Sequence, residues 1–148
     1  MRAVVQRVGG AKVEVAGEVV GRIDAGLVAF VGIGKGDTEV EATYLVDKIV
    51  GLRIFEDDTG KMNRALADVG GGLLVVSQFT LYGDVRRGRR PGFDDAMPPA
   101  DAEHLYDRVV ALFRERHPHV ETGRFRADMR VLVDNQGPVT LFIDTASG

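Results

Sequence analysis

The sequence predicts an α+β fold in one domain, with a mainly antiparallel, barrel-like sheet and two helices. Three observations lead to this prediction. Short apolar runs alternate with glycine-containing breaks in the first third of the chain, and two later segments carry apolar residues at helical spacing. The length of 148 residues suffices for one hydrophobic core but not for two ordinary domains. We therefore expect residues 1–148 to form a single domain.

The first third of the chain has the pattern of a β-meander. Gly9-Gly10, Gly17-Glu18 and Asp24–Gly26 are the expected turns, because glycine and aspartate favour the backbone conformations that turns require. The last apolar run is almost unbroken, so we expect that strand to be buried on both faces. The four expected strands are Ala3–Val8, Lys12–Val15, Val19–Ile23 and Leu27–Ile33.

Two amphipathic helices are expected further along. Thr38 and Glu41 have the spacing of a capping box, which marks the start of the first helix. The second helix should begin after Pro98-Pro99 and end at His117-Pro118. The apolar stripes are Ala42, Leu45, Val46, Ile49 and Val50 in the first helix and Leu105, Val109, Leu112 and Phe113 in the second.

The remaining strands lie between and after the helices. "LRIF" and "GGLLVVSQFTLYG" are strand-like, and Arg130–Asp134 and Val139–Ile143 follow the second helix. The sequence therefore predicts about six to eight strands. Pro138 lacks the amide hydrogen that a central strand needs, so it must lie at a strand entry, an edge or a bulge. Gly137 leaves the adjacent backbone without a side chain to cover it, so the pair marks either an ordinary turn or a stretch of main chain that is presented to something.

The composition excludes several classes of protein. There is no cysteine, which rules out disulfides, zinc thiolate sites and thiol nucleophiles. No apolar run approaches the roughly 20 residues of a membrane span, and "MRAVVQRV" has no apolar leader segment, so we expect a cytoplasmic protein. The net charge of −3 argues against broad nucleic-acid affinity, because such affinity comes from Lys and Arg that neutralise phosphates. Any RNA contact must therefore be local.

Several motifs of other enzyme classes match this sequence poorly. "VGIGKGDT" has the position of a nucleotide-binding loop, but Gly36 follows Lys35 where Ser or Thr is required. Ser77 lacks the flanking glycines of a hydrolase nucleophile. Adjacent carboxylates in Asp57-Asp58 and Asp94-Asp95 are typical of solvated loops. The histidines, at 104, 117 and 119, lack metal-site spacing, so we expect no metal.

One strongly basic loop stands out in this slightly acidic chain. "DVRRGRRPGF" carries four arginines within five positions, at Arg86, Arg87, Arg89 and Arg90. Two interpretations are open. The loop is either an exposed segment kept soluble by its charge or a phosphate-binding patch that uses the forked donors of arginine.

Two short motifs then point to a family. "SQFTL" at Ser77–Leu81 and "NQGPVT" at Asn135–Thr140 occur together in a chain of this length that begins "MRAVVQRV". The combination resembles the D-aminoacyl-tRNA deacylases, also called D-tyrosyl-tRNA deacylases, along essentially the whole sequence. The pair of motifs with their spacing is specific, although either motif alone would be a weak signal.

The resemblance implies a hydrolase that cleaves the ester between a D-amino acid, or glycine, and the terminal adenosine of tRNA. It implies a homodimer in which a cis Gly137-Pro138 pair reaches into the partner's active site. The pair then performs chiral proofreading by excluding L-aminoacyl esters. Ser77, Gln78, Phe79 and Thr80 would line the pocket for the adenosine and the ester, and no metal or organic cofactor is implied.

The chemistry of these residues supports this implication. An enzyme that accepts many side chains but only one configuration at the α-carbon must recognise groups that all its substrates share. A stiff Gly-Pro backbone can do so. For hydrolysis we hypothesise assistance by the ribose 2′-hydroxyl, with Thr80 and the amides near Phe79 and Thr80 holding the oxyanion. Attack by Thr80 itself is the rival mechanism. The alternative function is a non-catalytic dimer that binds RNA ends or a nucleotide.

Overall fold

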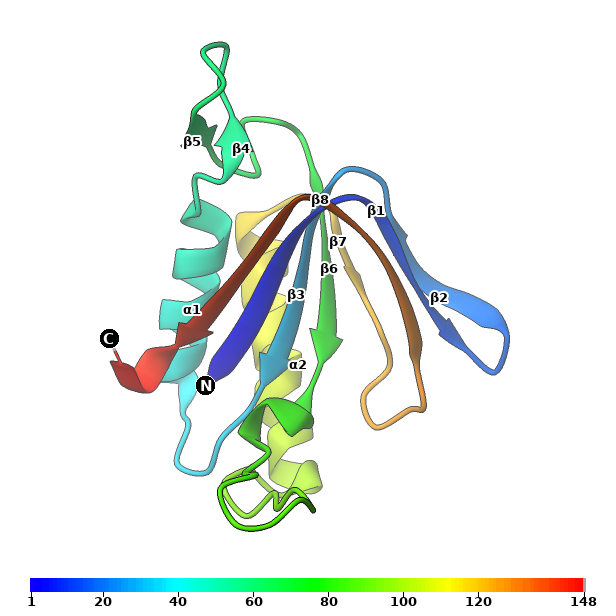
Figure 1. The fold of residues 1–148 in the computed structure, drawn as a ribbon, viewed down its shortest axis with the longest axis vertical. Coiled ribbons are helices and arrows are strands. Elements are labelled where there is room, and N and C mark those ends of the chain that lie inside the picture. The colour runs from blue at the N-terminus through cyan, green and yellow to red at the C-terminus, as the bar shows by residue number, and fades with distance from the viewer. Residues whose placement is uncertain (148) are drawn as a thin grey trace.

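The computed structural model describes residues 1–147 and contains eight strands and two α-helices. The strands are β1 (Arg2–Val15), β2 (Glu18–Ile23), β3 (Gly26–Gly32), β4 (Phe55–Glu56), β5 (Met62–Arg64), β6 (Gly72–Ser77), β7 (Val120–Thr122) and β8 (Arg130–Asp144). The helices are α1 (Glu39–Gly51) and α2 (Pro99–Arg116), and two short 3₁₀ helices are η1 (Phe79–Tyr82) and η2 (Thr145–Ser147). The expected α+β fold with two helices is confirmed (Figure 1).

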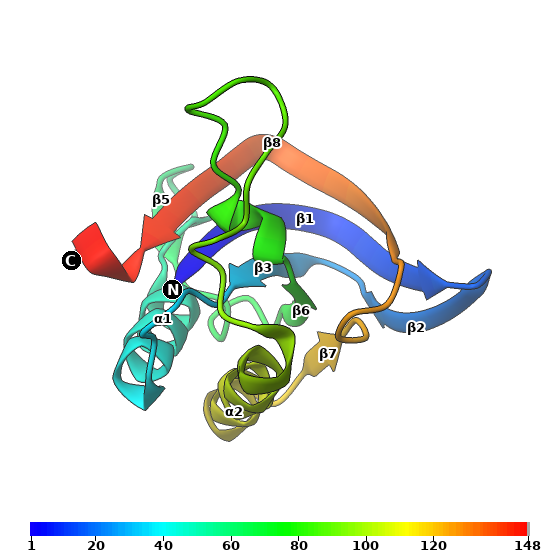
Figure 2. The same cartoon turned by 90° about the horizontal axis from the view of Figure 1, so that it is seen from below.

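The main sheet has the order β2-β1-β3-β6-β7, and β8 pairs with the free side of β1. β1 runs antiparallel to β2, β3 and β8, whereas β6 runs parallel to β3 and β7. The sheet curls so that β2 approaches β7, which gives a nearly closed, barrel-like arrangement (Figure 2). The sheet is thus mainly antiparallel, as expected, with a parallel centre.

Two apolar clusters pack against opposite faces of the sheet. On β6, Leu73 and Val75 belong to the cluster beneath α1 and α2, whereas Leu74 and Val76 belong to a second cluster on the other face. This alternation follows from the two-residue period of a strand. All residues of β3 and residues 72–76 of β6 are therefore apolar, which explains why the apolar run expected in β3 is unbroken.

The prediction of a turn at Gly9-Gly10 is wrong. β1 is one strand of 14 residues, and the glycines lie in its middle, next to register shifts in its pairing with β8. Before these glycines β1 pairs with β3, and after them it pairs with β2. A strand bends readily where it lacks side chains and where a bulge breaks the ladder. The glycines therefore fold the second half of β1 over the sheet instead of reversing the chain.

Three further segments differ from the expectation. Gln78–Tyr82 is not part of a strand, because β6 ends at Ser77 and the chain turns into η1. Arg130–Asp134 and Val139–Ile143 are two halves of one strand, β8. "LRIF" contributes only Phe55 to a strand, in the small β4–β5 hairpin.

The helices follow their sequence signals closely. Thr38 caps α1, with its hydroxyl oxygen accepting from the amide of Val40 at 3.2 Å and the Glu41 carboxylate accepting from the amide of Thr38 at 2.7 Å. α2 starts at Pro99 and ends before His117, whose buried ring nitrogen Nε2 lies 2.7 Å from the carbonyl oxygen of Gly71. Within residues 1–147 no helix is both long enough and apolar enough to span a membrane.

Candidate functional site

The first candidate segment is the tight turn that follows β6. Ser77 ends the strand, and the amide of Gln78 still donates to the carbonyl oxygen of Val31 on β3 at 2.8 Å. The chain then closes into η1, with the amide of Leu81 bonded to the carbonyl oxygen of Gln78 at 3.2 Å. The turn therefore sits at the carboxyl ends of the two adjacent parallel strands β3 and β6. That is the edge at which ligands bind in open α/β sheets.

The side chains of this turn are presented to solvent. Phe79 is 59% exposed, and its ring meets that of Phe93 edge to face with centroids 5.1 Å apart. Thr80 is also exposed, and its hydroxyl oxygen accepts a hydrogen bond from the Gln78 amide group. The amides of Phe79 and Thr80 open η1, where helical geometry offers no intrahelical acceptor. The turn thus offers an aromatic surface, a hydroxyl and two backbone donors within a few residues.

Glycines of β3 and the following loop make room for this turn. A Cβ on Gly32 would lie 2.9 Å from the carbonyl oxygen of Gln78, and one on Gly34 would lie 2.6 Å from the Tyr82 ring. The amide of Gly34 donates to the Asp37 carboxylate at 2.7 Å, and that of Lys35 donates to the carbonyl oxygen of Asp95 at 2.9 Å. These glycine-loop amides are therefore used within the chain, which argues against the nucleotide-loop alternative.

Arg2 fastens the turn to the C-terminal end of β8. Its guanidinium donates to the carbonyl oxygen of Leu81 at 3.0 Å and to the Asp144 carboxylate at 3.1 Å. The same group lies 4.5 Å from the centroid of the Tyr82 ring. Burial of that ring, together with the charge of Asp37, raises the pKa of Tyr82 above its ordinary value. Tyr82 is therefore held in its neutral form, and its ring packs against the Arg2 guanidinium.

The basic loop projects from the same edge of the sheet. Two backbone hydrogen bonds of 2.8 and 2.9 Å between Asp84 and Gly92 close it, and the residues between them are exposed. Arg86 is bound by the carboxylate of Asp84 at 2.9 and 2.7 Å, and this hydrogen bonding lowers the pKa of Asp84 to about 2. Among the described residues, no carboxylate pairs with Arg87, Arg89 or Arg90.

The second candidate segment is the Gly-Pro bulge of β8. Four residues, 136–139, lie between the pairs Val8 with Asn135 and Gln6 with Thr140, so they face the single residue Arg7. β8 is bonded only to β1, so Pro138 lies on an edge strand and in a bulge, as expected. Gly137 and Pro138 are exposed, and the peptide bond between them is cis, as the resemblance implied.

Arg7 holds this bulge, and sequence reasoning missed it. Its guanidinium donates to the carbonyl oxygen of Gln136 at 3.1 Å and to that of Ile54 at 2.8 Å. It thereby links the bulge to the segment before β4. Asn135 holds the other side by accepting from the amide of Val139 at 3.0 Å. The proximity of Arg7 to residues 136–139 arises only when β1 pairs with β8, so no local sequence signal reveals it.

The two candidate segments do not meet within one chain. The bulge lies level with Val8, which pairs with Gly26 on β3, and Gly26 pairs with Gly72 at the start of β6. Ser77 lies at the opposite end of β6, and a rise of about 3.3 Å per residue places it on the order of 17 Å away along the strands. Figure 1 shows the bend of β8 and the turn after β6 at opposite ends of the sheet.

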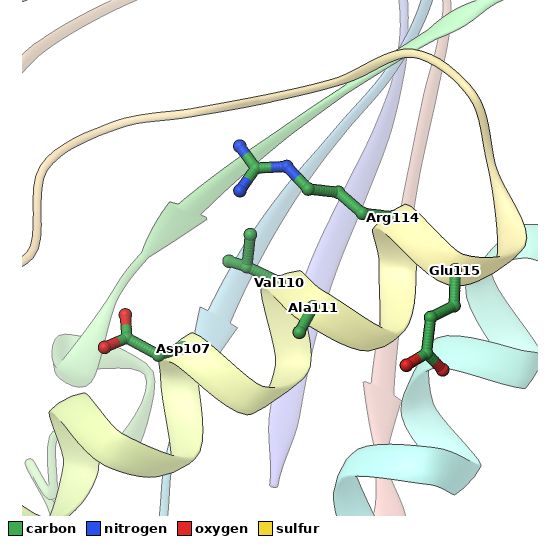
Figure 3. A pocket seen from close by; sticks show the side chains of 5 residues that line it. All are labelled: Asp107, Val110, Ala111, Arg114 and Glu115. Atoms are coloured by element: carbon green, nitrogen blue, oxygen red, sulfur yellow. The ribbon is translucent and has the colours of Figure 1, made fainter.

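Two hollows on the surface of the described residues lie outside both candidate segments. One hollow, of about 480 Å³, lies on α2 and is lined by Asp107, Val110, Ala111, Arg114 and Glu115 (Figure 3). A second hollow of about 450 Å³ lies where β1 bends. Residues 1–147 contain no cluster of three or more side chains suited to hold a metal ion. Within a single chain, the candidate catalytic groups therefore lie on the exposed turn after β6 and not in an enclosed pocket.

Comparison with solved structures first defines the class of fold. A chain described as "Structural Analysis of a probable eukaryotic D-amino acid tRNA deacylase" superposes with a TM-score of 0.81 at 17% identity, over 96% of this chain and 97% of that one. A second, described as "c-Myc DNA Unwinding Element Binding Protein", superposes with a TM-score of 0.94 at 39% identity, over 98% and 99%. The sheet and its two helices are therefore a known architecture.

Sequence comparison then gives the family. The chain belongs to the D-Tyr-tRNA(Tyr) deacylase family, whose model matches residues 4–144. A D-aminoacyl-tRNA deacylase of Sorangium cellulosum (strain So ce56) is 65% identical over 98% of this chain and 97% of its own length. One of Thermus aquaticus is 60% identical over 99% of this chain and 96% of its own length. The resemblance read from the two motifs is thus confirmed.

Proposed function

We propose that this protein hydrolyses the ester bond of D-aminoacyl-tRNA, releasing the free D-amino acid and tRNA, with residues 1–148 acting as one deacylase domain. The observation that carries the proposal is the match to named deacylases over nearly the whole of both chains. The exposed turn at Ser77–Thr80 supports it, because this turn gathers a hydroxyl, an amide side chain and an aromatic ring around two free backbone donors.

The active site is composed of segments from two chains. Gly137 and Pro138 lie at the far end of the sheet from Ser77–Thr80 of the same chain, so a single aminoacyl ester group cannot touch both within a monomer. β8 is an edge strand, and its Phe142 is 61% exposed, which is typical of a surface that pairs with another molecule. We therefore infer a homodimer in which the Gly-Pro bulge of one subunit completes the turn of the other.

The Gly-Pro bulge selects the hand of the substrate with its backbone. Carbonyl oxygens of a fixed main chain can hold the α-ammonium, which all aminoacyl esters share. The same wall leaves no space for a side chain that projects with the L configuration, and exclusion by clash acts regardless of side-chain size. Because glycine has no side chain, glycyl-tRNA would also be accepted and cleaved.

Hydrolysis takes place at the turn after β6. The amides of Phe79 and Thr80, with the Thr80 hydroxyl, stabilise the negative charge that develops on the ester oxygen. A single donor in an oxyanion hole contributes about 2.7–4 kcal/mol. Gln78 bonds to the terminal nucleotide or the ester, and Phe79 packs against it. The ribose 2′-hydroxyl lies beside the ester in the substrate itself and assists the attack of water, so no side-chain nucleophile is needed.

The basic loop contacts the RNA. Arg87, Arg89 and Arg90 extend from the edge that carries the turn and lack carboxylate partners among residues 1–147, whereas Arg86 is shared with Asp84. Phe93, at the base of the loop, packs on Phe79 and so connects the loop to the turn. Contacts to phosphates near the 3′ end would be shape-based, as is usual for RNA.

A single incubation tests the activity. We expect release of tyrosine from D-Tyr-tRNA and not from L-Tyr-tRNA. A non-catalytic RNA-end binder would release neither amino acid, and a protein that splits both esters equally would contradict the backbone selector.

A tRNA ending in 2′-deoxyadenosine separates the two mechanisms. Robust turnover of that substrate would exclude 2′-hydroxyl assistance, whereas full activity of Thr80→Ala would exclude Thr80 as the nucleophile.

A further inference from the structure

The three parallel strands end at one edge of the sheet, and each is followed by a loop with exposed basic residues. β3 leads to the loop with Lys35, β6 to the turn and the Arg86–Arg90 loop, and β7 to the loop with Arg124 and Arg126. We propose that Lys35, Arg124 and Arg126 extend the basic loop into a rim around η1 that binds the phosphates of the tRNA acceptor end. This inference rests on the proposed function.

The loop after β7 is held beside the candidate turn. The amide of Gly123 donates to the carbonyl oxygen of Val75 at 3.1 Å, two residues before the end of β6. Phe125 packs on Tyr106 of α2 with ring centroids 5.6 Å apart, and the Tyr106 hydroxyl donates to that same Val75 oxygen at 3.2 Å. With Phe125 anchored, Arg124 and Arg126 on either side of it are both exposed.

The loop after β3 is fastened to the opposite flank of the turn. Gly34 forms a β-bridge with Ala96, and the amide of Met97 donates to the carbonyl oxygen of Ile33 at 3.0 Å. Lys35 is exposed there. Seen from below, the loops after β3, β6 and β7 follow one another around η1 (Figure 2). The exposed basic residues thus lie on three loops at this end of the sheet instead of on one.

The charges of this rim are available to a ligand. Within residues 1–147, no carboxylate lies within salt-bridge distance of Lys35, Arg124 or Arg126, although arginines elsewhere, such as Arg108 and Arg116, are paired. Asp94, Asp95 and Asp128 also lie on these loops, so the rim is mixed in charge. Isolated arginines and a lysine between acids suit discrete phosphates, which arginine forks bind in a bidentate manner.

The backbone at Arg126 has an unusual conformation for a residue other than glycine. Its φ of 63° lies in the left-handed region, which a non-glycine residue adopts at a cost. Glycine would suit this turn better, so the position carries an arginine in spite of the local conformational preference. Such positions are enriched at functional sites, and Ala16, in the turn between β1 and β2, is the other described non-glycine residue in this region.

The experiment compares the salt dependence of tRNA binding. We would measure the affinity of uncharged tRNA for the full-length protein by fluorescence anisotropy between about 50 and 200 mM salt. The Arg124→Gln/Arg126→Gly pair should lower the magnitude of the slope of log K against log salt by about 1 to 2 and weaken binding several-fold. Arg126→Gly relieves the left-handed strain, so the pair should melt no lower than the parent protein.

Arg114→Gln is the matched control, because Arg114 is an exposed arginine on the helix layer that carries the hollow of Figure 3. An unchanged slope in the loop variant, or an equal fall in Arg114→Gln, would overturn the inference. A minimal substrate, 3′-O-(D-tyrosyl)adenosine, separates this failure from that of the proposed function. Its hydrolysis at the parental rate by the loop variant supports a rim that contacts only the RNA, whereas failure of the parent protein to hydrolyse D-Tyr-tRNA would refute the activity itself.

Discussion

At the scale of single residues, Arg7 is the side chain whose replacement should lower the activity without unfolding the protein. One guanidinium bonds to two carbonyl oxygens, of Gln136 and Ile54, and a lysine ammonium at the same position cannot reach both in the same geometry. We expect Arg7→Lys to lower kcat/KM for D-Tyr-tRNA about 10- to 100-fold, because hydrogen bonds from charged groups contribute about 1.5–3 kcal/mol.

The control for this prediction is Arg53→Lys. Arg53 is exposed in the neighbouring segment, and its guanidinium bonds to the Asn63 side chain at 3.1 Å instead of to the bulge. Equal losses of kcat/KM in the two variants, or full activity of Arg7→Lys, would show that the bulge needs no such support. Melting temperatures of both proteins report any general effect on stability.

Residue roles were only partly visible in the sequence. Ser77–Thr80 and the Gly-Pro pair were found because each is a contiguous motif. Arg2 and Arg7 were missed, because their partners, Leu81, Asp144 and Gln136, are distant in sequence and come close only through the pairing of β1 with β8. Nothing in the local pattern of "MRAVVQRV" distinguishes such arginines from solvated ones.

At the scale of elements, α1 provides a direct test of a sequence signal. The Thr38 hydroxyl and the Glu41 carboxylate form the reciprocal hydrogen bonds of a capping box, and those from Thr38 hold the pKa of Glu41 below its ordinary value. Thr38→Ala should lower the free energy of unfolding by about 1 kcal/mol. Chemical denaturation at neutral pH measures this loss.

The same cap should depend on pH in a defined direction. The lowered pKa means that the folded state favours the charged carboxylate, so the contribution of Glu41 is present above its unfolded pKa and is lost as the pH falls through the lowered value. The difference between the parent protein and Thr38→Ala should therefore shrink in acid. A difference that grew at low pH would contradict the role assigned to the carboxylate.

Elements with local signals were predicted well, and those decided by distant contacts were not. α1 and α2 begin and end where capping and proline residues indicate. Residues 78–82 have strand-like composition, but Gly32 and Gly34 of another strand and loop admit a tight turn there. Gly9-Gly10 has the local signature of a turn, yet the ladder with β8 continues through it and leaves only a bend.

At the scale of the whole molecule, the proposed active site, shared between two subunits, predicts complementation between two defective subunits. A Cβ at Gly137 would lie 3.0 Å from the Arg7 guanidinium and 2.9 Å from Val139, so Gly137→Ala should damage the bulge. Phe79→Ala/Thr80→Ala should damage the turn. In a heterodimer of these variants, one of the two sites combines both defects and the other has neither.

Mixing is therefore expected to restore activity. After joint unfolding and refolding of equal amounts, roughly a quarter of all sites should be intact if dimers form at random. The deacylation rate of the mixture then exceeds that of either variant alone. If the bulge and the turn served one substrate within a single chain, the mixture would be no more active than the average of its components.

The overall architecture was predicted as a class but not as a topology. Periodicity and composition sufficed for two helices and a mainly antiparallel sheet. They did not reveal that β1 pairs with β8, which joins the two ends of the chain, or that the centre of the sheet is parallel. Pairings between distant segments depend on the packing of the whole chain, which local patterns do not encode.

The continuous course of β1 has a consequence for how this protein loses its structure. Ala3 and Val5 pack in the cluster beneath the helices, whereas Val8, Ala11 and Val13 pack in the other, and β8 accompanies them on both sides of the bend. If the half of β1 in one cluster unfolded, the backbone hydrogen bonds between β1 and β8 would also be weakened in the half that belongs to the other cluster. Heat or denaturant should therefore dismantle both layers in one concerted transition, with hydrogen exchange equally slow in both.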